Sequence, residues 1–258
     1  MSVITALRVV EAHARVYRYT WRGSAVSTFL NPVLFLAAMG LGLGALVDQG
    51  GGGALPGADY LAFLAPGLLA ASAMQTGAGD GSWPVLVGIK WAKTYHAALA
   101  TPVGIRDLVV GHLGWVLVRL TLTTVVFAVV MAAFGAVPAV LAMAAVVPAI
   151  ITGMAFAVPV TALAATLEDG RGLTNLFRFG IVPMFLFSGT FFPIDQLPGW
   201  LQPIAYLTPL WHGVELCRSI ALGIEPTLPP AAHLSYLAAL MVAGGLAAVH
   251  TFRRRLQP

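Results

Sequence analysis

The chain has 258 residues, of which 59% are hydrophobic and 9% are charged, whereas soluble domains carry about 25% charged residues. This composition and a mean hydropathy of +0.86 exclude a soluble globular protein and predict an all-α polytopic membrane protein. The net charge of +4 is better explained by membrane topology than by binding to nucleic acid. Cys217 is the only cysteine, so no intrachain disulfide forms.

The N-terminal segment, residues 4–23, places apolar side chains at three- and four-residue steps with arginines between them. This pattern predicts an amphipathic helix in the membrane interface, with its cations at the lipid headgroups. The alternative is that the segment is simply the basic flank of the first span. The arginines are Arg8, Arg15, Arg18 and Arg22.

Six apolar segments follow, each close to the roughly 20 residues that cross a bilayer. The predicted spans are residues 27–47, 60–78, 108–134, 139–167, 173–192 and 231–252. Twelve lysines and arginines fall at the two termini and in the loops after spans two and four, and only Arg218 falls in the other loops. Because such cations stay on the cytoplasmic side, both termini are predicted to be cytoplasmic.

The loop between spans two and three is polar and contains the pair Thr101-Pro102, which favours a helix break and restart. A short cytoplasmic helix held between two spans suits a segment that receives force from a soluble partner. An ordinary amphipathic connector has the same pattern, and the spacing alone does not choose between them.

Arg119 is the formal charge that lies well inside an apolar span. An arginine at the centre of a span costs roughly 2.5–3.5 kcal/mol on insertion scales. Either this helix face meets protein or a watered cavity, or the span begins later and Arg119 reaches the cytoplasm by snorkelling. The sequence names no carboxylate partner for it.

Motifs for catalysis are missing from the sequence. There is no G-x-x-x-x-G-K-[ST] phosphate loop and no H-E-x-x-H pair, so we expect neither ATP hydrolysis, nor a metal, nor a cofactor in this chain. Ser188 with His212 or His250 would suggest an intramembrane enzyme, but no nucleophile elbow surrounds Ser188. Serine and glycine in membrane helices more often permit close packing.

The stretch from Phe185 to Arg218 is apolar, yet four prolines interrupt it. Prolines block a continuous helix, so a seventh span is excluded. This stretch, together with the basic N-terminal helix, the six spans and the loop "YHAALATPVGIRDLVVGHLGW", resembles the membrane permease subunits of ABC type-2 exporters, such as the nodulation-factor export and daunorubicin-resistance permeases. Its most specific match is "FLFSGTFFPIDQLPGWLQPIAYLTPLWHGVELCRSIALG".

The resemblance implies a permease subunit in the bacterial cytoplasmic membrane that pairs with a second permease copy and two separate ATPase subunits, which hold ATP and Mg. It implies a coupling helix within residues 95–108 and two outer re-entrant helices, residues 197–206 and 210–222, with Pro209 at their turn. The implied coupling residues are Arg8, Arg15, Arg18, Tyr95, Thr101, Pro102, Arg106 and Asp107. The candidates for the translocation path or gate are Arg119, Phe185, Phe187, Phe191, Phe192, Trp211 and His212.

The substrate class stays open on sequence grounds, because such permeases move drugs, lipids and glycolipids or polysaccharides. Aromatic side chains suit a drug contact, an outer gate or plain helix packing equally well. An intramembrane enzyme acting on lipid or peptide, and a passive channel or scaffold, are the alternative functions.

Overall fold

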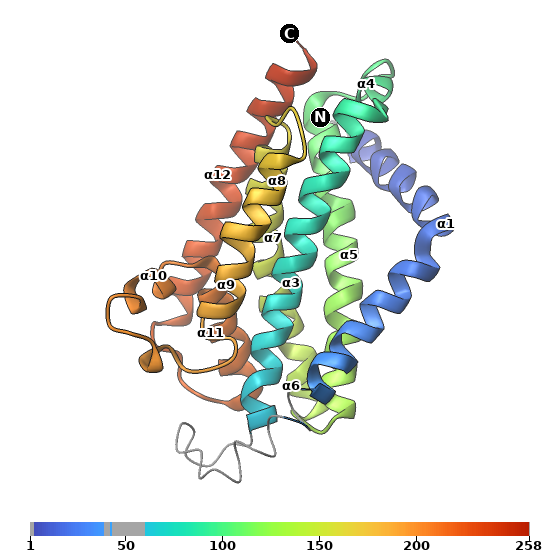
Figure 1. Cartoon of the computed structure of the whole chain (residues 1–258). Helices are drawn as coiled ribbons and strands as arrows, with labels where there is room; N and C mark the ends of the chain where they lie inside the picture. Colours follow the sequence, from blue (N-terminus) through green and yellow to red (C-terminus); the bar gives the residue numbers. More distant parts are fainter. Residues whose placement is uncertain (1–2, 39–41, 43–59, 258) are drawn as a thin grey trace.

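A computed structural model describes residues 3–38, 42 and 60–257, and every regular element among them is helical. In chain order (Figure 1) the elements are α1 (Val3–Phe35), α3 (Tyr60–Leu86), the π-helix η2 (Val87–Trp91), α4 (Thr94–Leu99), α5 (Ile105–Ala133), α6 (Ala139–Ala144), α7 (Val146–Ala164), α8 (Arg171–Leu176), the π-helix η3 (Phe177–Ile181), α9 (Val182–Phe187), the 3-10 helix η4 (Ile194–Gln196), α10 (Gln202–Tyr206), α11 (Pro209–Leu222) and α12 (Pro230–Leu256).

Four helical stretches among the described residues are long and apolar enough to cross a membrane. They correspond to predicted spans two, three, four and six, and they comprise Tyr60–Trp91, Ile105–Ala133, Ala139–Ala164 and Pro230–Leu256. The chain is therefore a multi-pass membrane protein, as its composition predicts. The total of six spans remains a prediction.

The helix boundaries differ from the predicted ones at the N-terminal half of the chain. The predicted interface helix and the start of the first span form one helix, α1, which bends midway along its length (Figure 1). The rest of that span and the Gly-rich loop after it lie largely outside the described residues. Span two runs on to Trp91, well beyond residue 78, because the polar residues that suggested a loop are accommodated inside a helix.

The boundaries also differ in the second half. Predicted span four divides into α6 and α7, and helical structure in predicted span five covers residues 171–187. The segment of residues 197–222, predicted to form re-entrant helices, contains α10 and α11, which begin at Gln202 and Pro209. Pro209 is thus the first residue of α11. At this position a backbone N–H has no acceptor within the helix, so proline, which lacks the N–H, breaks no helical hydrogen bond.

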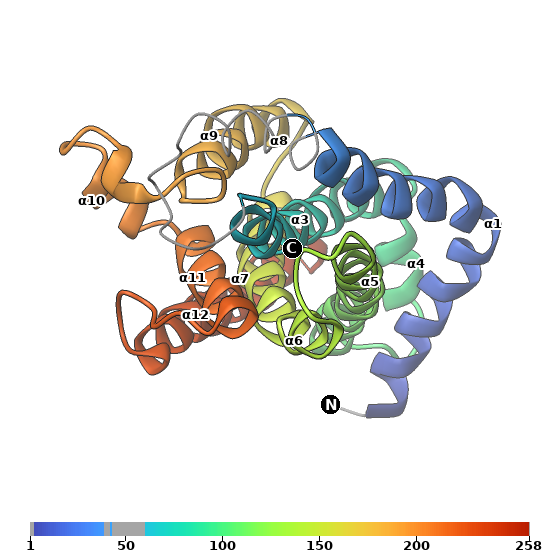
Figure 2. The ribbon, with the colours of Figure 1, turned by 90° about the horizontal axis from the view of Figure 1, so that it is seen from below.

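The centre of the bundle is α3, with α5, α7 and α11 around it (Figure 2). Small residues bring α3 and α7 into backbone contact: a Cβ added at Gly77 would lie 2.1 Å from the carbonyl oxygen of Gly153, and one at Gly81 would lie 2.6 Å from that of Ala157. Because apolar helices in lipid gain little from hydrophobic burial, such close packing is a main source of their association.

Both termini and α4 lie at one end of the bundle, which we call the terminal end, and α6 and α10 lie toward the other end, the distal end (Figure 1). Glu168, which follows α7, ties the terminal end together. It accepts hydrogen bonds from Lys90 of η2 at 2.6 Å and from Arg255 of α12. The hydrogen bond from Arg255, and then that from Lys90, lowers the pKa of the Glu168 carboxyl from 4.5 to about 2.

Candidate functional site

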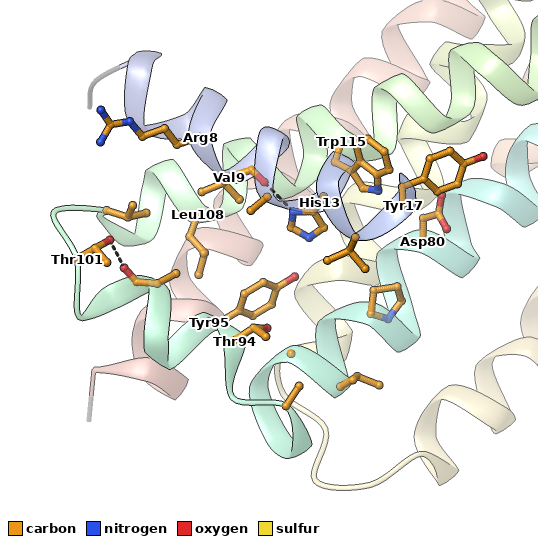
Figure 3. A pocket seen from close by; sticks show the side chains of 18 of the residues that line it. Arg8, Val9, His13, Tyr17, Asp80, Thr94, Tyr95, Thr101, Leu108 and Trp115 are labelled. Atoms are coloured by element: carbon orange, nitrogen blue, oxygen red, sulfur yellow. Dashed lines mark hydrogen bonds between the residues drawn. The ribbon is translucent and has the colours of Figure 1, made fainter. Parts of the chain in front are cut away.

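A cavity of about 900 Å³ lies at the terminal end between α1, α3, α4 and α5 (Figure 3). Its walls include five of the residues that the sequence singled out, although these come from three separate segments of the chain. They are Arg8 from α1, Tyr95, Thr101 and Pro102 from α4 and the turn after it, and Arg119 from α5. The structure thus brings α1 and the loop helix together on one cavity.

The loop helix is shorter than predicted, because α4 ends at Leu99 and α5 already begins at Ile105. Tyr95 anchors α4: its side chain is 4% exposed, its hydroxyl lies 3.1 Å from His112 Nδ1, and its ring packs on Phe252. Burial raises the pKa of the Tyr95 phenol. Through this residue α4 is fixed to both α5 and α12.

The remaining coupling candidates lie outside the cavity walls. Arg106 is exposed in the first turn of α5, whereas Asp107 is buried and its Oδ2 accepts a hydrogen bond of 3.3 Å from the backbone N–H of Gly104. Asp107 therefore caps the start of α5. Arg15 pairs with Glu11 on the exposed side of α1 at 2.7 Å, and Arg18 is exposed on the same helix.

Arg119 has a carboxylate partner that sequence reasoning missed. Its Nε lies 3.3 Å from Oδ2 of Asp80, and its guanidinium lies 4.8 Å from the centroid of the Tyr17 ring. The two charged side chains are only 15% and 27% exposed. Asp80 was assigned to a loop, but it lies inside α3. This pair decides between the two interpretations of Arg119: the side chain faces protein and the cavity.

The four phenylalanines that were candidates for the translocation path or gate lie in different surroundings in the structure. The Phe185 ring contacts Phe191 edge-on at 5.0 Å and Phe35 of α1 at 6.1 Å. Phe187 points away and is 41% exposed. Phe192 packs instead on a separate group that contains Trp211. A single gate formed by all four phenylalanines does not fit this arrangement.

Trp211 and His212 lie in the first turn of α11, and both are buried. His212 Nδ1 is 2.8 Å from Nδ1 of His233, and the His212 ring stacks on Tyr236 at 4.1 Å. Both partners belong to α12. These aromatic contacts attach the start of α11 to α12.

Arg218 is a second residue that sequence reasoning misjudged, because it was counted as a loop cation. Its side chain is buried, donates hydrogen bonds to the carbonyl oxygens of Gly189 (2.9 Å) and Phe63 (3.3 Å), and lies 3.7 Å over the Phe63 ring. It therefore joins α11 to α3 and to the turn after α9. An arginine in the middle of an apolar stretch was the available signal, since such a charge needs internal partners.

Ser188, the residue considered as a nucleophile, is completely buried. Its hydroxyl is 2.7 Å from that of Thr208, and among the described residues no histidine is bonded to it. Across residues 3–38, 42 and 60–257, no three His, Cys, Asp or Glu side chains gather in a way that suits a metal ion.

Comparison with known proteins adds an independent result. A family model described as ABC-2 type transporter matches residues 11–222. The chain is 32% identical to nodulation protein J of Rhizobium meliloti (strain 1021) over 245 residues, which cover 92% of this chain and 90% of that protein. Its identity to nodulation protein J of Sinorhizobium fredii (strain NBRC 101917 / NGR234) is 33%, with 92% and 89% covered. Nodulation protein J of Rhizobium leguminosarum bv. viciae is also similar, at 32% identity, with 92% and 90% covered.

Proposed function

The chain belongs to the ABC-2 type transporter family, and we propose that it is the permease subunit of an exporter powered by a separate ATPase. The observation that carries the proposal is the family match, which extends from within α1 to the end of α11. The relatives called nodulation protein J match over nearly their whole length. Because the sequence has no phosphate loop, we assign ATP and Mg to the partner subunit.

We propose an assembly of two permease copies and two ATPase subunits in the bacterial cytoplasmic membrane, with the terminal end in the cytoplasm. Support for this orientation comes from the predicted cytoplasmic cations, because the basic last turn of α12 lies at the terminal end together with α4 (Figure 1). The exported substrate is proposed to be hydrophobic or amphipathic: a drug, a lipid or a glycolipid.

Coupling is proposed to run through α1, α4 and the first turn of α5, which surround one cavity. Movement of an ATPase against exposed Arg106 and the Thr101-Pro102 turn would reach α5 directly, and it would reach α12 through buried Tyr95 and its contact with Phe252. At the distal end, the Phe185 and Phe191 rings and the contacts of Trp211 and His212 are the candidates for the outer gate.

The test is transport by the chain reconstituted with a candidate ATP-binding partner subunit. The permease alone should hydrolyse no ATP, and the complex should show ATPase activity that substrates from a panel of drugs and glycolipids stimulate. Arg106→Glu should reduce transport while ATP hydrolysis continues. Arg178→Glu changes an exposed arginine of η3 and serves as the matched control.

Normal transport by Arg106→Glu would remove this residue from the coupling route. Failure of the purified permease to associate with any ATPase would contradict the exporter itself.

A further inference from the structure

The cavity at the terminal end is large enough to hold a ligand. Its volume of about 900 Å³ falls within the roughly 300–1,000 Å³ of small-molecule sites. Arg8 and Thr101 lie at one end, and Tyr17 and Asp80 lie at the other, with α1 along one side (Figure 3). The cavity is thus elongated.

This cavity also extends far along the bundle. Trp115 and Arg119 belong to its lining, and they follow the start of α5 at Ile105 by 10 and 14 positions. At about 1.5 Å per residue, Arg119 lies roughly 20 Å along the helix from that start. A soluble protein docked on the terminal end does not reach this depth, whereas a chain-like apolar ligand does.

The middle of the cavity is apolar and aromatic. Its lining includes Val9 and Val16 of α1, Leu108 and Trp115 of α5, and Val87 of η2. The aromatic rings also contact each other, since Trp115 lies against His13 and Tyr17 at 6.2 Å and 5.5 Å. Such walls suit a hydrocarbon chain, which needs no hydrogen-bond partners.

The charges around the cavity favour an anion at its Arg8 end. Three formal charges line it, and two of them, Asp80 and Arg119, pair with each other. Arg8 is exposed and forms no ion pair with any residue that the structure describes. Arg8 is therefore the cation at this end of the cavity that is available to a ligand.

We propose that the cavity is a binding site for an anionic phospholipid of the cytoplasmic leaflet, with the phosphate at Arg8 and one acyl chain along the wall from Val9 to Trp115. The bound lipid contacts α1, α4 and the Thr101-Pro102 turn at once, so it adjusts the spacing of the proposed coupling elements. The proposal goes beyond export and rests on the proposed orientation of the terminal end.

The test uses the full permease, with and without its ATPase partner, in nanodiscs of phosphatidylglycerol and phosphatidylcholine, with a photoreactive analogue of each lipid. Mass spectrometry should map the phosphatidylglycerol adducts to peptides of α1, α4 and the first half of α5. Ala98→Trp, which fills the cavity from α4, should remove most of these adducts. Ala97→Trp, on the exposed side of the same helix, should leave them unchanged.

Arg8→Gln should lower phosphatidylglycerol labelling by about two- to five-fold, the effect of one exposed ion pair. Arg18→Gln removes an exposed arginine outside the cavity and should have no such effect. The arginine comparison also keeps the test decisive if Ala98→Trp misfolds.

Three results would overturn the lipid site: adducts that persist in Ala98→Trp, equal labelling by phosphatidylcholine, or labelling that vanishes when the ATPase binds and thereby covers the cavity. Loss of transport with intact labelling would count only against the proposed function, because labelling needs neither ATP nor substrate.

Discussion

Gly77 of α3 provides a direct test of how the bundle is held together. A methyl group at this position would place its carbon 2.1 Å from the carbonyl oxygen and 2.8 Å from the carbonyl carbon of Gly153. Ordinary van der Waals contact begins near 3.4 Å, so α3 and α7 must move apart by more than 1 Å in Gly77→Ala. Overpacking of this kind costs about 1–3 kcal/mol.

Gly79→Ala is the matched control, because it makes the same chemical change two positions along the same helix. No atom lies within 4 Å of a Cβ added at Gly79. Replacing a helical glycine by alanine gains about 0.5–1 kcal/mol when space allows. The two variants should therefore differ by about 1.5–4 kcal/mol, with opposite signs relative to the unchanged protein.

The free energy of unfolding in mixed detergent micelles, titrated with dodecyl sulfate, measures this difference. Gly77→Ala should also weaken transport, because displaced α7 carries α12 with it through the contact of Gly244 with Pro159. Equal stability of the two alanine variants would refute the close helix contact that defines the core.

Three further predictions concern charges and topology. The pKa of Glu168 in the folded protein is lowered to about 2, so its stabilising contribution is complete above pH 4.5 and is lost as the pH falls toward 2. The difference in stability between Glu168→Gln and the unchanged protein, measured by thermal unfolding, should therefore shrink over that range. Asp80→Asn should destabilise the bundle by about 1.5–3 kcal/mol, and Arg119→Gln should destabilise the Asp80→Asn variant less than it destabilises the unchanged protein. If the two changes in unfolding free energy simply added in the double variant, the ion pair would be refuted. Cys217 is fully buried, so maleimide should not label the folded protein from either side of the membrane. Gly199 is exposed, so Gly199→Cys in a Cys217→Ala background should react with maleimide in intact cells. Labelling only after permeabilisation would reverse the proposed orientation.

The coupling region shows which structural features can be predicted from the sequence. The basic N-terminal helix and the Thr101-Pro102 break were predicted from local patterns, and the structure places both on one cavity. The helix boundaries around them were less accurate, since polar residues such as Asp80 suggested a loop that is in fact helical. Whether a polar residue ends a helix in a membrane depends on whether a partner is present, and the partner lies elsewhere in the chain.

For the gate candidates, closeness in the sequence did not predict closeness in the structure. Four phenylalanines close in sequence appeared as one cluster, but Phe185, Phe187 and Phe192 point to three different surroundings. The turn after Phe187 ends the helical periodicity, so the directions of the side chains beyond it depend on the path of the backbone.

By itself the sequence determined that this is a helical membrane protein and where its apolar segments lie, because hydropathy and span length are local properties. Only the tertiary structure decided which charges meet. Asp80 reaches Arg119 across 39 positions, and Arg218 reaches the carbonyl group of Phe63 across 155. Such pairs depend on how each helix is rotated about its axis, and that rotation is set by close contacts such as Gly77 on Gly153, which no local pattern contains.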